Sequence, residues 1–120
     1  MDIKQKGFKM SEKTTSEDIY EFLILKVLIE SGGSAEPHHI KKRIFQIWGN
    51  KMTPEDLEEY AHSKKIRWET LVHWERDHLK RKGHLRSNSP HGVWEITESG
   101  RGRHQELVDY LRHELGSVNR

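Results

Sequence analysis

The 120-residue chain has no cysteine, only three prolines and no long apolar run. The lack of cysteine excludes disulfides, thiolate zinc sites and cysteine nucleophiles, and it agrees with the reducing cytoplasm in which we expect the protein to reside. No stretch has the length and apolarity of a membrane-spanning helix, and we expect no signal peptide and no membrane partner. These absences favour one small domain with one modest core.

Charge is abundant but unevenly distributed, with 33% charged and 32% hydrophobic residues. Residues 63–92 hold eight Lys or Arg and three acids, a net charge of +5, so the remaining residues must sum to −3 to give the overall +2. The basic segment has a helical pattern followed by a hairpin pattern, and such a shape suits a polyanion. Duplex DNA is the commonest partner of this kind.

Apolar periodicity and capping residues predict the elements. Helices are predicted at residues 17–31, 37–48, 54–61, 66–82 and 101–116, and a β-hairpin at residues 84–96. A short extended link is expected between the first two helices. This order predicts a mostly helical α+β fold, a winged helix-turn-helix with an extra short helix and a C-terminal helix. Residues 66–82 would be the recognition helix and residues 84–96 the wing.

The domain is expected to fill residues 16–120, after a flexible N-terminal arm at residues 1–15. Ser16 is the predicted N-cap of the first helix. Thr53, followed by Pro54 and acidic residues, predicts the N-terminus of the short helix 54–61. Leu57 and Tyr60 would be its inward side chains.

The recognition helix has a clear apolar face. The residues predicted for the core from this helix and the wing are Trp68, Leu71, Val72, Leu79, Trp94 and Ile96. Glu75 falls on the same inner face, where a small apolar residue is expected. Either the helix packs differently from the usual arrangement, or Glu75 pairs with a nearby cation.

Several strings resemble the N-terminal domain of Mrr-type restriction endonucleases. They are RWETLVHW at residues 67–74, LKRKGHL at 79–85 and GVWEITESG at 92–100, and the likeness extends over about residues 19–102. The resemblance implies a winged helix-turn-helix that binds double-stranded DNA ahead of a nuclease domain. It also implies a link with restriction or defence and a preference for modified bases.

Cleavage in that family needs a metal-binding Asp and a Glu-x-Lys motif on a separate α/β core, and this chain shows neither. We therefore expect a non-catalytic module without a cofactor or metal, working with a nuclease domain in cis or in trans. The nine histidines do not change this expectation, because His38 and His39 point to different faces, and His73 and His78 lack a well-placed carboxylate.

The candidate DNA contacts fall into three groups. The outward side of the recognition helix would supply base contacts. Cations near it would contact phosphates, and the wing tip would contact a phosphate or the minor groove. The candidate base contacts are Arg67, Thr70, His73, Trp74 and Asp77. The candidate phosphate contacts are Lys64, Lys65, Lys80, Arg81 and Arg86. The candidates at the wing tip are Ser87, Asn88 and His91. For Trp74 two placements stay open, because it lies about 120° from the centre of the apolar face: it packs against the wing or the first helix, which we favour, or it touches DNA.

Each of these groups also has a simpler interpretation, as a solvated helix face, a solubilising charge run or a plain turn. Two other functions stay open. One is a transcriptional regulator, which differs only in its DNA target. The other is a protein-interaction or dimerisation module, for which Leu107, Leu111 and Leu115 of the last helix could form a homodimer contact.

Overall fold

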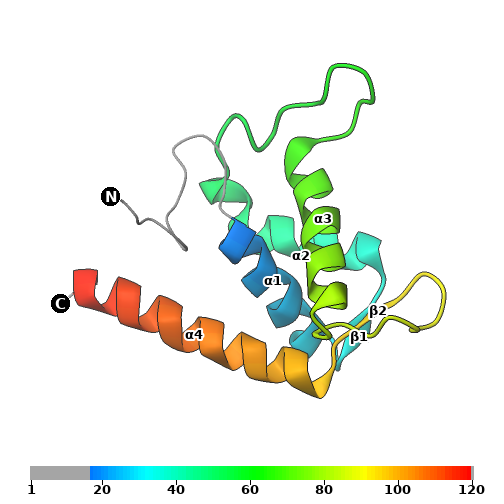
Figure 1. The fold of residues 1–120 in the computed structure, drawn as a ribbon. Coiled ribbons are helices and arrows are strands. Elements are labelled where there is room, and N and C mark those ends of the chain that lie inside the picture. Colours follow the sequence, from blue (N-terminus) through cyan, green and yellow to red (C-terminus); the bar gives the residue numbers. More distant parts are fainter. Residues whose placement is uncertain (1–16, 120) are drawn as a thin grey trace.

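A computed structural model describes residues 17–119 of the chain, and the side chains of residues 18–113. Its elements follow the order α1 (Glu17–Glu30), β1 (Ser34–Ala35), α2 (Pro37–Trp48), the 3-10 helix η1 (Gly49–Lys51), α3 (Arg67–Arg81), β2 (Trp94–Glu95) and α4 (Glu98–Asn119) (Figure 1). The predicted arm at residues 1–15 and the predicted cap Ser16 lie outside the described residues. The predicted winged-helix order is confirmed.

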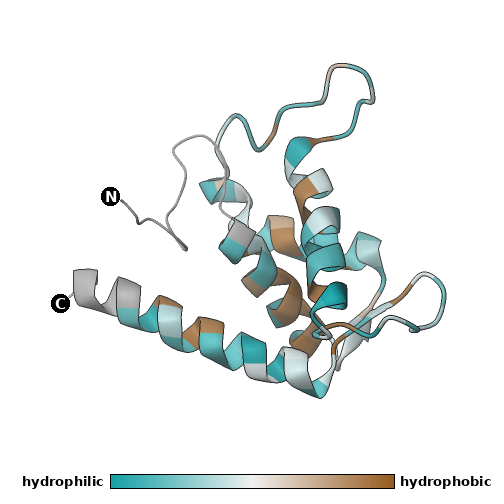
Figure 2. Ribbon diagram, viewed as in Figure 1, coloured by the Kyte–Doolittle hydropathy of each residue, from teal (hydrophilic) through white to brown (hydrophobic). Residues whose placement is uncertain are grey.

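Helix α1 is the centre of the fold, and α2, α3 and α4 all pack against it. Its apolar residues, part of which Figure 2 shows as brown segments, cover most of its circumference, and the helix is buried on nearly every side. The buried hydrophobic residues of α1 are Ile19, Tyr20, Leu23, Ile24, Leu25, Val27 and Leu28. Trp68 of α3 stacks on Tyr20 with 6.5 Å between ring centroids, which ties the recognition helix to this centre.

The sheet is small and serves to hold the wing. β1 pairs antiparallel with β2, with Ala35 opposite Trp94. The two arms of the predicted hairpin meet at an isolated bridge between Leu85 and Ile96, and the backbone N–H of Arg86 donates to the Glu95 carbonyl at 2.8 Å. The wing is therefore anchored on both sides of β2, while residues 87–93 form an open loop.

The predicted helix at residues 54–61 is wrong. The expected cap does form, because the Thr53 N–H donates to an Asp56 carboxylate oxygen at 2.9 Å and the Asp56 N–H donates to the Thr53 hydroxyl at 3.2 Å. The chain turns only once, however, and then doubles back through an antiparallel bridge between Glu59 and Ile66. This segment has too few apolar residues to bury a helical face, and a short helix without such burial is marginal.

Helix α4 begins at Glu98, three residues before its predicted start, and continues to Asn119. Thr97 fixes its N-terminus, since its hydroxyl donates to the Gly83 carbonyl at 2.7 Å and accepts from the Gly100 N–H at 3.0 Å. A Cβ at Gly100 would collide with the carbonyl oxygen of His84 and with Ile96. Only glycine allows α4 to start this close to the base of the wing.

A buried ion pair fastens α4 to α1. Arg103 donates from Nε and Nη2 to the two carboxylate oxygens of Glu21, at 2.7 and 3.1 Å. The Glu21 side chain is only 4% exposed, and the bidentate bond raises the pKa of Arg103. Among the described residues, no helix has the length and apolarity needed to cross a bilayer.

Glu75 lies on the inner face of α3, where the sequence left open whether the helix packs differently or Glu75 pairs with a cation. Its side chain is 7% exposed, and its Oε1 lies 3.6 Å from Nδ1 of His78, one turn further along the same helix. Helix α3 runs unbroken through this position. Glu75 therefore has a cationic partner when His78 is protonated, and the helix keeps the predicted inner face of Trp68, Val72 and Leu79.

Candidate nucleic-acid interface

The outward side of α3 is the surface where most candidate residues meet. His73, Trp74 and Asp77 are exposed on it, and Thr70 is partly exposed. Arg67 begins the helix but is only partly accessible, and its Nε is buried without a hydrogen-bond partner. The structure thus brings four of the five predicted base-contacting residues onto one accessible face.

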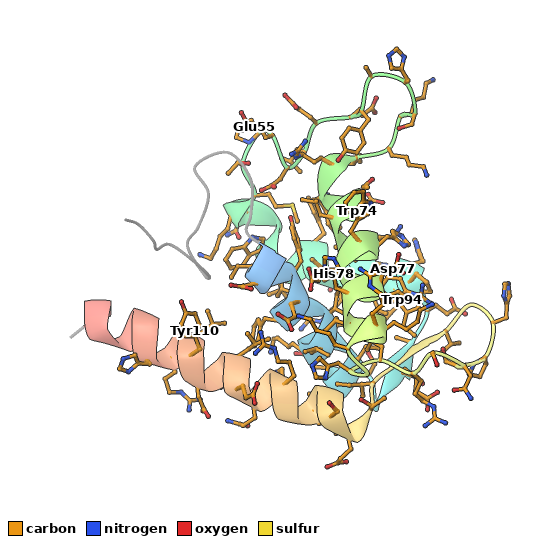
Figure 3. The ribbon with its side chains drawn as sticks, viewed as in Figure 1. Glu55, Trp74, Asp77, His78, Trp94 and Tyr110 are labelled. Carbon is orange, nitrogen blue, oxygen red and sulfur yellow. The ribbon has the colours of Figure 1, made fainter. Side chains whose placement is uncertain are left out.

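Of the two placements considered for Trp74, the structure shows the exposed one and not the favoured packing against the wing or the first helix. Its side chain is 64% exposed, the largest fraction among the exposed large hydrophobic residues of the described chain. Figure 3 shows Trp74 on α3, with Asp77 and Trp94 further along towards the wing. A large aromatic side chain in this position is costly in water and available to a partner.

A shallow hollow of about 520 Å³ follows this face of α3. Its lining residues come from α2, from the loop before α3 and from α3 itself: Lys41, Lys64, Lys65, Ile66, Glu69, Thr70, His73, Trp74 and Asp77. A second hollow is lined by Trp74, Asp77, His78 and Arg81. Trp74 and Asp77 contribute to both, so they lie where these two hollows meet.

His73, on α3, contacts side chains from two other elements. Its Nε2 lies 3.2 Å from the ammonium of Lys41 on α2, and its ring meets Trp94 of β2 edge-on with 5.4 Å between centroids. Desolvation lowers the pKa of His73, and the charges of Lys41 and Arg76 lower it further, against the opposing effect of Glu69 and Asp77. The imidazole therefore serves chiefly as a joint between α2, α3 and the wing.

Arg76 strengthens the same joint. Its guanidinium lies over the Trp94 ring, 5.3 Å from the centroid. Trp94 is itself buried and belongs to the core. The base of the wing and α3 are consequently held together through one tryptophan ring.

Each acid on this surface lies beside a cation. Glu69 is 3.4 Å from Lys41, Asp77 is 3.4 Å from Arg76, and Glu95 is 3.6 Å from Arg86. These contacts offset the negative charge locally, so the unpaired excess on the surface is positive. Exposed pairs of this kind contribute little to stability.

Lys64 and Lys65 lie in the loop that precedes α3. The Tyr60 N–H donates to the Lys65 carbonyl at 2.8 Å, which closes the tip of the loop, and Lys64 adopts a left-handed backbone conformation with φ of 60°. Both lysine side chains are exposed. They stand at the N-terminal end of α3, and Arg81 is exposed at the C-terminal end.

The wing loop holds the remaining candidates near that C-terminal end (Figure 1). Arg86, Ser87, Asn88 and His91 are all exposed, and Lys80 is partly exposed. The loop has its own internal support, because the Ser89 hydroxyl donates to the Val93 carbonyl at 2.8 Å. The candidate residues are thus arranged along α3 with cations at both ends, over roughly 20 Å for a 15-residue helix.

Lys41 is a functional candidate that the sequence did not suggest. It lies on α2, outside the basic segment, and reaches the surface only because α2 packs beside α3. The sequence indicated only that Lys41 lies on the polar side of an amphipathic helix. No cluster of three potential metal ligands occurs in the part of the chain that the structure describes.

Comparisons with known proteins agree with this architecture. The solved structure of a winged-helix DNA-binding protein from STIV is similar to this chain, with a TM-score of 0.51 and 23% sequence identity over 78% of this chain and 88% of that one. No curated protein matches the chain. The Mrr N-terminal domain matches residues 20–106, which is most of the sequence and includes α3 and the wing. The chain therefore belongs to the Mrr N-terminal domain family.

Proposed function

We propose that this protein is a non-catalytic module that binds double-stranded DNA, with α3 in the major groove and the wing beside it. The observation that carries the proposal is the accessible face of α3, bordered by exposed cations at both ends. An α-helix fits the major groove, and cations beside it contact phosphates. The winged-helix DNA-binding structure described above supports the same use of the fold.

The phosphate contacts are assigned to Lys64, Lys65, Lys80, Arg81 and Arg86. Such contacts release counterions, so the logarithm of the binding constant should fall by about 0.9 for each contact per tenfold rise in salt. Ser87, Asn88 and His91 on the wing are proposed to approach a phosphate or the minor groove. Base contacts are assigned to Thr70, Trp74 and Asp77 on α3, and His73 lines the same surface.

The test is a charge reversal on this surface, Lys80→Glu/Arg81→Glu/Arg86→Glu, measured by fluorescence titration against duplex DNA at two salt concentrations. We expect binding to weaken by at least about 100-fold at low salt, because three phosphate contacts become repulsions. The matched control is Lys51→Glu/Arg101→Glu/Arg112→Glu, which makes the same change in net charge at exposed residues of η1 and α4 that are not among the proposed DNA contacts. Equal binding by both variants would contradict the proposal.

Family membership supports a role in restriction or defence, with a nuclease domain acting in cis or in trans. A preference for modified bases is part of this proposal, and the exposed Trp74 supports it, since an apolar surface in the major groove favours added methyl groups. Titration with matched methylated and unmethylated duplexes tests it. A transcriptional regulator would instead bind a palindromic site as a dimer.

Self-association through α4 is a second candidate function. Leu107, the first residue of the predicted stripe, is buried in the core of its own subunit, and Leu115 lies outside the residues with described side chains. The remaining support is Tyr110, which is 40% exposed, beside the partly exposed Leu111. Sedimentation equilibrium at tens of micromolar tests it, and a monomer at that concentration would exclude this role.

A further inference from the structure

We infer that Trp74 and Asp77 form one base-reading unit that selects cytosine in the major groove. The inference rests on the proposed function and adds the base that α3 recognises. The two residues are three apart on α3, so they are neighbours on one face of the helix. Both residues also line each of the two hollows described above along the outward side of α3.

The position of Asp77 is informative because a carboxylate opposes binding to DNA phosphates. Its side chain is 53% exposed, and its Oδ1 lies 3.4 Å from Nη1 of Arg76. Arg76 is also drawn to the Trp94 ring, on the wing side. The contact between Arg76 and Asp77 reduces the electrostatic repulsion between the Asp77 carboxylate and DNA phosphates. It leaves acceptor capacity on the two carboxylate oxygens, since a carboxylate can accept about four hydrogen bonds.

The chemistry of base edges limits what a carboxylate can read. Guanine presents two acceptors in the major groove and thymine presents an acceptor with a methyl group, so both repel Asp77. Cytosine and adenine present amino groups, which can donate to it. In adenine the amino group lies beside the N7 acceptor, whereas in cytosine it lies beside the apolar C5–H edge.

Trp74 decides between these two bases. Its exposed ring, next to Asp77, would cover the C5–H edge of cytosine while Asp77 accepts from the amino group. The ring carbons of Trp74 beside adenine N7 would desolvate an acceptor without replacing its hydrogen bond, which is unfavourable. Asp77 and Trp74 together therefore match the amino group and the C5–H edge that cytosine presents in the major groove.

The test is selection from a random-sequence duplex library at low salt, followed by sequencing, with the intact chain and with Asp77→Asn. We expect one position of the selected motif to be cytosine. Asparagine pairs with the amino group and N7 of adenine, so Asp77→Asn should shift that position to adenine by at least about fivefold. Trp74→Ala should reduce the cytosine enrichment and admit adenine at the same position, because the side chain that discriminates between the two bases is lost.

Asp109→Asn is the matched control, since it makes the same chemical change at an exposed position of α4. It should return the parent motif. A motif without a cytosine position, or the same motif from Asp77→Asn as from the parent, would overturn the cytosine assignment while leaving DNA binding intact. If the parent retains no more DNA than the charge-reversed variant of Lys80, Arg81 and Arg86, the proposed function fails, and this inference fails with it.

Discussion

Helices α1 and α3 are similar in length but differ in how much of their surface the fold uses. α1 is enclosed by the other three helices and buries eight of its residues. α3 buries four of its fifteen residues and leaves its other side accessible. The difference shows that α1 is constrained almost everywhere by packing, whereas the outer side of α3 can carry chemistry that the fold does not need.

The largest expected effect tests whether the buried and exposed faces of α3 differ, by truncating its two tryptophans in turn. Trp68→Ala should destabilise the protein by about 3–5 kcal/mol, because a buried ring between Tyr20 and Phe45 is lost. Trp74→Ala should change stability by less than about 0.5 kcal/mol, because its side chain is largely exposed. Urea unfolding followed by circular dichroism measures both, and similar losses would show that the two faces are not distinct.

A smaller effect is expected at the buried charge of α1. Arg103→Ala should cost about 2–3 kcal/mol, because Glu21 would be left buried without its bidentate partner. This is less than for a fully buried pair, since the Arg103 side chain is 31% exposed. The double variant Glu21→Leu/Arg103→Leu should recover much of this loss, since it removes both charges. Unfolding free energies of the single and double variants test this, and an equal loss in both would contradict the role assigned to the pair.

The smallest expected effect is a dependence of stability on pH, which involves one histidine that packs against α1 and one that lies on α3. His104 stacks on Phe22 of α1, and desolvation together with Lys26 lowers its pKa; the pKa of His73 on α3 is also lowered. Below about pH 6.5 the unfolded chain therefore binds more protons at these sites than the folded chain, so stability falls as the pH falls. Acid pH thus favours unfolding at both sites.

The measurement is the free energy of unfolding between pH 7 and pH 5.5. His73→Gln/His104→Gln should lose less stability over this range than the parent, and His62→Gln, at an exposed loop position, should behave like the parent. A parallel loss in all three proteins would exclude a contribution from His73 and His104.

The sequence predicted those parts of the fold that local signals determine. Pro37 and the glycine after Trp48 bound α2 at the predicted residues, and the double glycine after α1 ends it within one residue of the prediction. The segment after Thr53 shows the limit, because its capping residues form as predicted but the helix does not follow. A cap specifies where a helix can start, whereas burial of an apolar face decides whether it continues.

The candidate surface was predictable in outline but not in detail. The basic segment indicated α3 and the wing, yet Trp74 could not be placed, because its angular position lies between the inner and outer faces. Lys41 was missed because its approach to His73 depends on the packing of α2 beside α3. Helix periodicity gives the side of one helix, but contacts between helices require their relative placement.

The connection between α2 and α3 has a consequence for how this domain can vary. The backbone N–H of Trp68 donates to the Asp56 carbonyl at 3.0 Å, and Asp56 is buried at the beginning of the loop. The start of α3 is therefore fastened outside the loop tip at residues 60–65. Lengthening a surface loop costs only a few tenths of a kcal/mol per added residue or less. The tip that carries Lys64 and Lys65 is therefore a site where insertions could change the reach of the protein along a duplex without refolding its reading helix.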